Sequence, residues 1–247
     1  MVIMDDLGDR IKLYEHSFSQ VLPIRLPVII RVDGRSFHRF TRGMKKPFDD
    51  DFRDAMAKTA MVLCKEISGA KIAYSQSDEI SILLTNDDSI ETQPWFRNEI
   101  NKLVSISASL ATVAFNRLII EKWREKYPHF DSRVFIIPSD DINNYFVWRQ
   151  KDWERNSLNM LARSHFSQKQ IHGLKRDEIH EKLWKEKSVN WNDLPTKHKR
   201  GICVIPDVKG WKIDEEIPIF TQDRKFISSL LVKDGELNGS RNDTRTT

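Results

Sequence analysis

The stretch 28-VIIRVDGRSFHRF-40 decides the fold, because an apolar run ends there abruptly in an acidic turn and a basic, aromatic segment. Four of the five residues from 28 to 32 are apolar and β-branched. This pattern predicts a central strand covered on both faces, and the Asp-Gly pair that follows is a strong stop signal. We therefore expect Asp33 at the end of a buried strand.

A second acidic turn lies in the stretch 73-AYSQSDEISILL-84. Ile80, Ile82 and Leu84 alternate along one face of a predicted strand, and the polar residues before them have the composition of a hairpin turn. Asp78 then lies at the tip of the hairpin. If the two strands are neighbours in one sheet, both aspartates reach the same edge, and Gly34 lets the backbone approach a ligand closely.

Two carboxylates at one sheet edge suit a magnesium site. Mg²⁺ prefers carboxylate and carbonyl oxygens together with substrate phosphates. Two such ions can clamp the attacking and leaving oxygens of an in-line phosphoryl displacement. Asp-Gly and Ser-x-Ser-Asp-Glu are also common turn sequences, so a purely structural role for either turn stays an alternative. On spacing alone, the catalytic and the structural interpretations are equally good.

At these residues the sequence resembles the tRNA-histidine guanylyltransferases and their relatives, the guanylyltransferase-like 3′-to-5′ RNA polymerases. The ten-residue motif 31-RVDGRSFHRF-40 is specific, and the resemblance spans most of the chain. The other matching segments are 46-KP-47, 76-QSDEIS-81, 130-FDSRV-134, 148-WRQKD-152, 192-NDLP-195 and 199-KRG-201.

The resemblance implies an α+β fold, with a palm domain like that of nucleic acid polymerases and nucleotide cyclases. It also implies a nucleotidyltransferase that extends RNA at the 5′ end. Members activate the 5′-monophosphate of a tRNA with a nucleoside triphosphate, usually ATP. The 3′-hydroxyl of the incoming nucleotide, which is GTP or another nucleoside triphosphate, then attacks the activated phosphate.

The same resemblance implies the roles of individual residues. The residues implied to coordinate two Mg²⁺ ions are Asp33, Gly34 through its main-chain carbonyl, and Asp78. Lys46 matches the lysine that handles the triphosphate. Glu79 either stabilises the metal-binding residues without coordinating the ions itself, or faces solvent as an ordinary strand residue. The implied catalytic residues are Asp33, Asp78, Lys46 and Glu79. The implied nucleotide-binding residues are Asp33, Gly34, Arg35, Ser36, Phe37, His38, Lys46, Ser77 and Asp78.

One segment departs from the eukaryotic guanylyltransferases, which carry His-Ile-Asn-Asn-Leu-Tyr-Asn where this chain has 154-ERNSLNM-160. The guanylyltransferase-like proteins similarly lack that stretch. We therefore predict template-dependent repair of truncated tRNA 5′ ends, with guanylate addition to histidine tRNA as the alternative. More remote alternatives are a palm-type nucleotide cyclase and a catalytically silent tRNA-binding protein, and the intact Asp33 and Asp78 argue against the silent protein.

Composition bounds the class of protein. The 247 residues suit one large domain or one domain with an appendage. The formal net charge is only +4, but a pI near 9.0 permits a basic face for a polyanion. The sequence contains no run of eighteen apolar residues, so it predicts no membrane span. Cys64 and Cys203 are predicted to be reduced and buried. We expect a soluble, cytoplasmic protein with tRNA and nucleoside triphosphates as partners, and the resemblance implies a dimer or tetramer of identical chains.

The predicted palm covers residues 1–140. Its order of strand, helix, hairpin, helix and strand fits an antiparallel-rich split βαβ sheet with helices on one face. An amphipathic helix over residues 5–18 is expected to pack on the sheet, and the longest helical pattern runs from 96 to 126.

The predicted extension covers residues 141–236, is mainly helical with further strand segments, and packs on the palm. Scattered basic residues in it are expected to bind RNA phosphates. The candidates are Lys175, Arg176, Lys199 and Arg200. Residues 237–247 are polar and are predicted to be a disordered tail.

Overall fold

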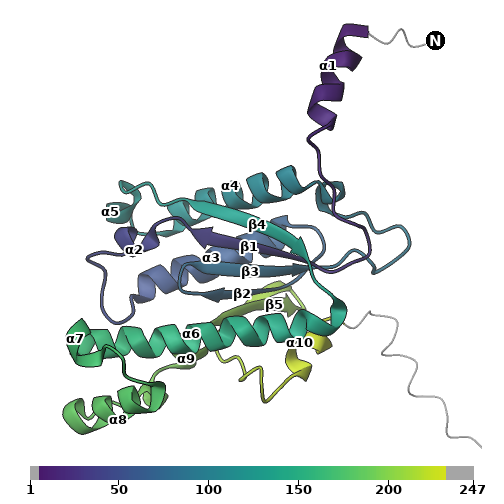
Figure 1. The fold of residues 1–247 in the computed structure, drawn as a ribbon. Helices are drawn as coiled ribbons and strands as arrows, with labels where there is room; N and C mark the ends of the chain where they lie inside the picture. Colours follow the sequence, from purple (N-terminus) through teal and green to yellow (C-terminus); the bar gives the residue numbers. More distant parts are fainter. Residues whose placement is uncertain (1–5, 232–247) are drawn as a thin grey trace, which may run out of the picture.

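The structure is a computed structural model that describes residues 6–231. At its centre is a six-stranded antiparallel sheet in the order β4-β1-β3-β2-β5-β6 (Figure 1). The strands are β1 (Val28–Gly34), β2 (Ala70–Gln76), β3 (Glu79–Leu84), β4 (Phe130–Ile136), β5 (Ile202–Asp207) and β6 (Gly210–Asp214). The helices are α1 (Asp6–His16), α2 (Phe37–Phe40), α3 (Asp50–Glu66), η1 (Trp95–Asn98), α4 (Ile100–Leu118), α5 (Glu121–Arg124), η2 (Ser139–Asp141), α6 (Ile142–His165), α7 (Gln168–Ile171), α8 (Arg176–Lys187), η3 (Trp191–Asp193), α9 (Thr196–Arg200) and α10 (Lys225–Ser229).

The succession β1-α3-β2-β3-α4-β4 forms the predicted split βαβ arrangement. β3 pairs antiparallel with β1 on one side and with β2 on the other, so β1 and β2 run parallel with β3 between them. β4 pairs with the other edge of β1. The prediction of an α+β palm with an antiparallel sheet is therefore confirmed.

Helices cover both faces of the sheet, which agrees with the cover on both faces predicted for the strand at 28–32, whereas the expectation that the helices of the palm lie on one face is wrong. Val28, Ile30 and Val32 pack in the core with residues of α3 and α4, whereas Ile29, between them in sequence, packs in the core with residues of α6 (Figure 1). All four side chains are at most 2% exposed. An uninterrupted β-branched run presents apolar groups to both faces of a sheet, and each face then needs its own cover.

The C-terminal part shares the sheet of the palm. β5 and β6 come after α6 to α9 in sequence, yet β5 pairs with β2 and extends the same sheet. The predicted boundary at residue 140 therefore divides segments that build one sheet. α8 and η3 pack against the second half of α6 around a separate apolar cluster that contains Leu158, Leu161, Ile179, Leu183 and Trp191. The predicted tail, residues 237–247, lies outside the described residues.

Helix α1 does not pack on the sheet, contrary to the prediction. It extends away from the body of the molecule (Figure 1). Leu7, Ile11 and Tyr14, which form its apolar stripe, are 57%, 48% and 64% exposed. The amphipathic pattern predicted the helix correctly, but α3, α4 and α6 already cover the two faces of the sheet.

The longest helix is α6, with 24 residues, and not the predicted segment 96–126. That segment contains three successive residues with left-handed backbones, Phe96 to Asn98, and it bends again after Leu118. The side-chain amide of Asn98 donates to the carbonyl oxygen of Pro23 at 3.1 Å, which holds the first break in place. Among the described helices, none is long and apolar enough to cross a bilayer.

Candidate active site

The two acidic turns meet at one edge of the sheet. Asp33, near the end of β1, lies directly opposite Glu79, the first residue of β3. The main-chain N–H of Gly34 donates to the carbonyl oxygen of Asp78 at 3.0 Å, which ties the turn after β1 to the tip of the β2–β3 hairpin. The neighbouring strands predicted from the two acidic turns are therefore present.

Three carboxylates form a row across adjacent strands at this edge. Asp131 on β4 and Glu79 on β3 are both cross-strand partners of Asp33 on β1, and such partners point to the same face of a sheet. Burial, followed by repulsion from neighbouring carboxylates with Asp78 first, raises the pKa of Asp33 to about 6. Arg133, whose Nη2 lies 3.8 Å from Asp33 Oδ2, acts against this shift. The edge thus concentrates negative charge that a bound cation relieves.

Both turns bend through left-handed backbones. Ser36 has φ of 58° and Ser77 has φ of 47°, a region that residues other than glycine rarely adopt and that recurs at functional sites.

Gly34 is required for a different reason from the predicted one. A Cβ atom there would lie 2.5 Å from the ring of Phe37, so the chain's own side chain, rather than a ligand, fills the space that glycine leaves.

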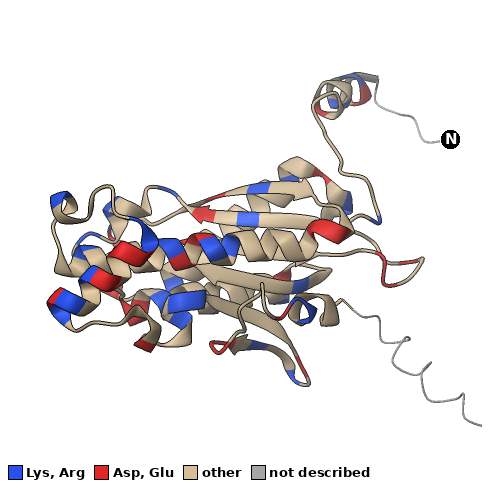
Figure 2. Ribbon diagram, turned by 60° about the horizontal axis from the view of Figure 1, so that its bottom comes forward, with Lys and Arg blue, Asp and Glu red and all other residues tan. Residues whose placement is uncertain are grey.

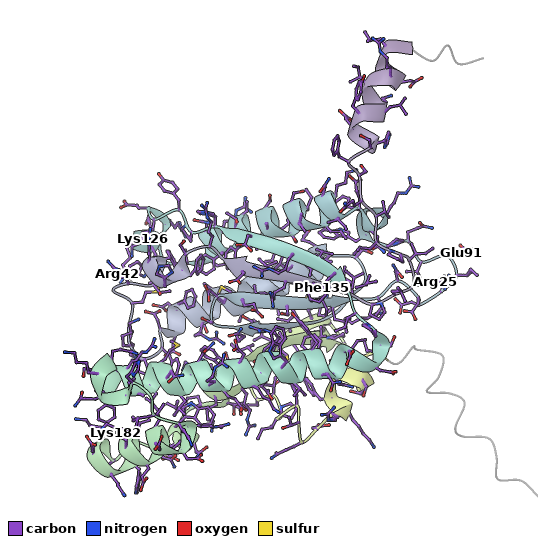
Figure 3. The ribbon with its side chains drawn as sticks, in the orientation of Figure 1. Arg25, Arg42, Glu91, Lys126, Phe135 and Lys182 are labelled. Atoms are coloured by element: carbon purple, nitrogen blue, oxygen red, sulfur yellow. The ribbon has the colours of Figure 1, made fainter. Side chains whose placement is uncertain are left out.

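A cleft of about 450 Å³ opens beside this edge. The turn after β1, the loop 41–49 with the start of α3, the hairpin tip and the second half of α6 all line it. Lys126 holds the start of the loop, because its Nζ donates to the carbonyl oxygens of Phe40 and Arg42 at 2.9 and 3.1 Å (Figure 3).

Most of the predicted nucleotide-binding residues line the cleft. These are Gly34, Ser36, Phe37, His38, Lys46, Ser77 and Asp78. Phe37 contributes only to the floor, because its ring is 2% exposed and packs in the core. Asp33 and Arg35 are not part of the lining. The Arg35 guanidinium instead lies 3.3 Å from the imidazole of His129.

Arg53, on α3, is a cleft residue that sequence reasoning missed. It is 2% exposed, its Nη1 donates to the carbonyl oxygen of Ser77 at 3.3 Å, and its Nε and Nη2 have no hydrogen-bond partner in the described part of the chain. Burial lowers the pKa of Arg53 to about 10, so the side chain is a cation at neutral pH. A buried cation with unpaired donors beside a cleft suits an anionic ligand. The sequence gives no signal for it, because Arg53 lies within the apolar pattern of α3.

Helix α6 supplies further lining residues that were not predicted, namely Trp153, Met160 and Arg163. The ring of Trp153 lies 5.1 Å from the guanidinium carbon of Arg53. Arg163 is exposed and adds positive charge to that of Lys45 and Lys46. The cleft therefore combines cations with aromatic and apolar walls.

Glu79 does not face solvent, so that alternative is wrong. Its side chain is 8% exposed, and Arg149 on α6 binds both of its carboxylate oxygens at 2.7 Å. Glu79 is therefore a buried, paired carboxylate one position after Asp78. Arg149 belongs to the matched segment 148–152, but the sequence alone gave it no role.

The four basic residues predicted to bind RNA have different surroundings. Lys175 and Arg176 are exposed at the start of α8. Lys199 and Arg200 are partly buried, and each donates to a main-chain carbonyl oxygen near α9. Acidic and basic residues are mixed over the helices of this half of the molecule (Figure 2). RNA binding by these four residues stays a prediction.

The fold and the site together place the protein among nucleotidyltransferases with a polymerase-like palm. The chain belongs to the tRNA(His) guanylyltransferase (Thg1) family, since the family model described as tRNAHis guanylyltransferase matches residues 8–138, more than half of its length. The recognition of this family from its motifs is confirmed.

Individual relatives agree with this assignment. A probable tRNA(His) guanylyltransferase of Dictyostelium discoideum is 30% identical over 215 residues, which cover 78% of this chain and 80% of the relative. A bacterial tRNA(His) guanylyltransferase-like protein in complex with ATP is 44% identical, with a TM-score of 0.88 and coverage of 93% of this chain and 100% of that chain. A bacterial protein of the same description in complex with GTP is 41% identical, with a TM-score of 0.77 and coverage of 92% and 99%.

Proposed function

We propose that the protein adds nucleotides to the 5′ end of tRNA and uses ATP and GTP as substrates. The observation that carries this proposal is the juxtaposition of a cation-lined cleft with the carboxylates of Asp33 and Asp78 at the sheet edge. The complexes of the two similar bacterial proteins with ATP and GTP support nucleoside triphosphates as ligands of this protein.

The residues at the sheet edge fit Mg²⁺. Asp33 and Asp78 offer carboxylate oxygens and Gly34 offers a main-chain carbonyl, which are the hard oxygen ligands that Mg²⁺ prefers. Burial, with a smaller contribution from repulsion by neighbouring carboxylates, raises the pKa of both aspartates, and a cation bound between them would favour their charged forms. When bound there, Mg²⁺ supplies charge neutralisation on the triphosphate and alignment of the reacting groups.

The chain's own residues bind and orient the nucleotide. Lys46 and Arg163 provide positive charge for the triphosphate, and the hydroxyl of Ser77 can donate to a phosphate oxygen. Met160 lines the cleft with apolar surface that excludes water from the bound nucleotide, whereas Trp153 is 1% exposed and contributes only to the floor. These contacts hold the reactive phosphate against the carboxylate edge, which is the main contribution a protein makes to phosphoryl transfer.

Two RNA substrates have to be distinguished. The names of the relatives favour guanylate addition to histidine tRNA over templated repair. Templated repair is the second candidate, because segment 154–160 lacks the eukaryotic asparagine-rich stretch and part of it serves packing. Ser157 is fully buried, donates to the His198 carbonyl oxygen at 2.6 Å and accepts from Trp191 Nε1 at 3.0 Å.

Nucleotide incorporation tests the proposal. The full chain, Mg²⁺, ATP, GTP, CTP and UTP are combined with two 5′-monophosphorylated RNAs, an intact histidine tRNA without the extra guanylate and a tRNA lacking its first nucleotide. Guanylate addition to the histidine tRNA supports guanylylation, whereas preferential addition of the nucleotide complementary to the opposing base supports templated repair. Failure to extend either RNA would refute the proposal. Formation of a cyclic nucleotide from a nucleoside triphosphate without RNA would instead make the protein a cyclase. The dimer or tetramer and the cytoplasmic location stay predictions.

A further inference from the structure

Glu79, the residue after Asp78, is bound by α6 through both of its carboxylate oxygens. Arg149 donates from Nε to Oε1 and from Nη2 to Oε2, each at 2.7 Å. The two side chains are only 7% and 8% exposed. A bidentate pair of this kind is strong, and it fixes the orientation of the carboxylate as well as its position.

Neighbouring groups enclose this ion pair. The hydroxyl of Ser81 donates to Glu79 Oε1 at 3.2 Å and lies 2.8 Å from the hydroxyl of Tyr145. Arg149 Nη2 also donates to Asp152 at 3.2 Å, and the ring of Trp148 lies 4.3 Å from the guanidinium carbon. The pair is therefore packed between β3 and α6.

An unpaired carboxylate at position 79 would disturb the carboxylate edge. Glu79 is the cross-strand partner of Asp33, so the two side chains leave the sheet on the same face, with Cβ atoms about 4.5–5.5 Å apart. Without Arg149, the Glu79 oxygens would be free to reach the cation that Asp33 and Asp78 hold. Arg155, on the same helix as Arg149, is exposed and pairs with the other oxygen of Asp152 rather than with Glu79.

We propose that Arg149 is a positioning residue of the nucleotidyl transfer site. It holds Glu79 away from the cation, so that two carboxylates rather than three coordinate the cation. Arg149 also fastens the hairpin tip that carries Asp78 to α6. The inference rests on the proposed function, because it takes Asp33 and Asp78 as the cation-binding residues.

Three variants of the full chain test this inference: Arg149→Met, the double variant Glu79→Gln/Arg149→Met, and Arg155→Met as the matched control. Binding of Mn²⁺ alone, without nucleotide or RNA, is measured by electron paramagnetic resonance. Turnover is measured separately on the RNA that the wild type extends. Circular dichroism and thermal unfolding confirm that each variant is folded.

In Arg149→Met, we expect Mn²⁺ to bind about five- to tenfold more tightly, because a third carboxylate joins the site. Turnover should fall about ten- to hundredfold, as expected when a residue that orients metal ligands is lost. In the double variant, Mn²⁺ affinity should return to the wild-type value and turnover should recover at least partly, because no extra charge is left. Arg155→Met should match the wild type in both measurements.

Two results would overturn the inference. Unchanged or weaker Mn²⁺ binding in a folded Arg149→Met variant would reduce Arg149 to a structural residue, and so would a double variant no better than the single one. If Arg149→Met does not fold, the comparison is made with Arg149→Lys. This variant keeps the charge but loses the bidentate contact with Glu79, so it should show the same increase in Mn²⁺ affinity and the same loss of turnover to a smaller degree. If the wild type binds Mn²⁺ but extends no RNA, the proposed function fails while the metal-binding comparison still tests Arg149.

Discussion

Replacing Gly34 by alanine tests whether the core and the site are coupled through a single contact. The new methyl carbon would lie 2.5–2.7 Å from three ring carbons of Phe37, whereas ordinary contacts begin near 3.4 Å. The ring cannot retreat freely, because it packs on Phe40, Phe115 and Phe130 at centroid distances of 4.8, 5.6 and 5.0 Å. The turn itself must therefore move.

Overpacking of this kind costs about 1–3 kcal/mol of unfolding free energy. For a chain of this size, that corresponds to a fall in melting temperature of about 2–12 °C. The same shift displaces the N–H of Gly34 from the Asp78 carbonyl, so we expect nucleotide addition to fall about hundredfold. Calorimetry and a single-turnover incorporation assay measure the two effects on the same preparation.

Gly173→Ala is the matched control, because Gly173 has φ of 81° but a methyl group there would meet no neighbouring atom within 4 Å. It should lose stability through backbone strain alone and keep full activity. A second variant, Gly34→Ala/Phe37→Leu, makes room for the methyl group and should be less destabilised than the sum of its single changes. An unchanged melting temperature and full activity in Gly34→Ala, or strict additivity in the double variant, would refute the reasoning.

The remaining predictions concern single ionisable groups. Asp33→Asn and Asp78→Asn should abolish nucleotide addition in the incorporation assay. Because the folded pKa of Asp33 is raised to about 6 from 3.8, its ionisation destabilises the metal-free fold above that pH, so Asp33→Asn should melt higher than the wild type at pH 7, with a difference that vanishes near pH 4. Arg53→Met should weaken nucleotide binding about tenfold by equilibrium titration, yet preserve or raise the melting temperature, because no carboxylate pairs with the buried guanidinium in the described part of the chain. Burial lowers the pKa of His198, so the wild type should lose stability as the pH falls through 6.5, and His198→Phe should lose less over the same range in pH-dependent denaturation. Loss of activity without the stability gain in Asp33→Asn, weakened folding with normal nucleotide binding in Arg53→Met, or parallel pH profiles for His198→Phe and the wild type would contradict these expectations.

The sequence by itself determined the elements that carry the site and the chemistry at their ends. The β-branched run before Asp33 identified a central strand, and the turn at Asp78 identified the hairpin beside it. These inferences succeed because strand periodicity and turn chemistry are local, and a strand stop places the next polar residue at a sheet edge. The family motifs are equally local, which is why most of the predicted nucleotide-binding residues line one cleft.

Only the tertiary structure decided what surrounds those residues. Glu79 and Arg149 are 70 residues apart, and Arg53 reaches Ser77 across 24 residues. Hydrophobic periodicity shows that a face is covered, but it does not identify the covering element, so neither the role of α6 as the cover of the second face nor the exposed stripe of α1 was predictable. A charged residue in a helix likewise looks the same in sequence whether it meets water or a buried carboxylate, because its partner is set by packing between elements rather than by its neighbours in the chain.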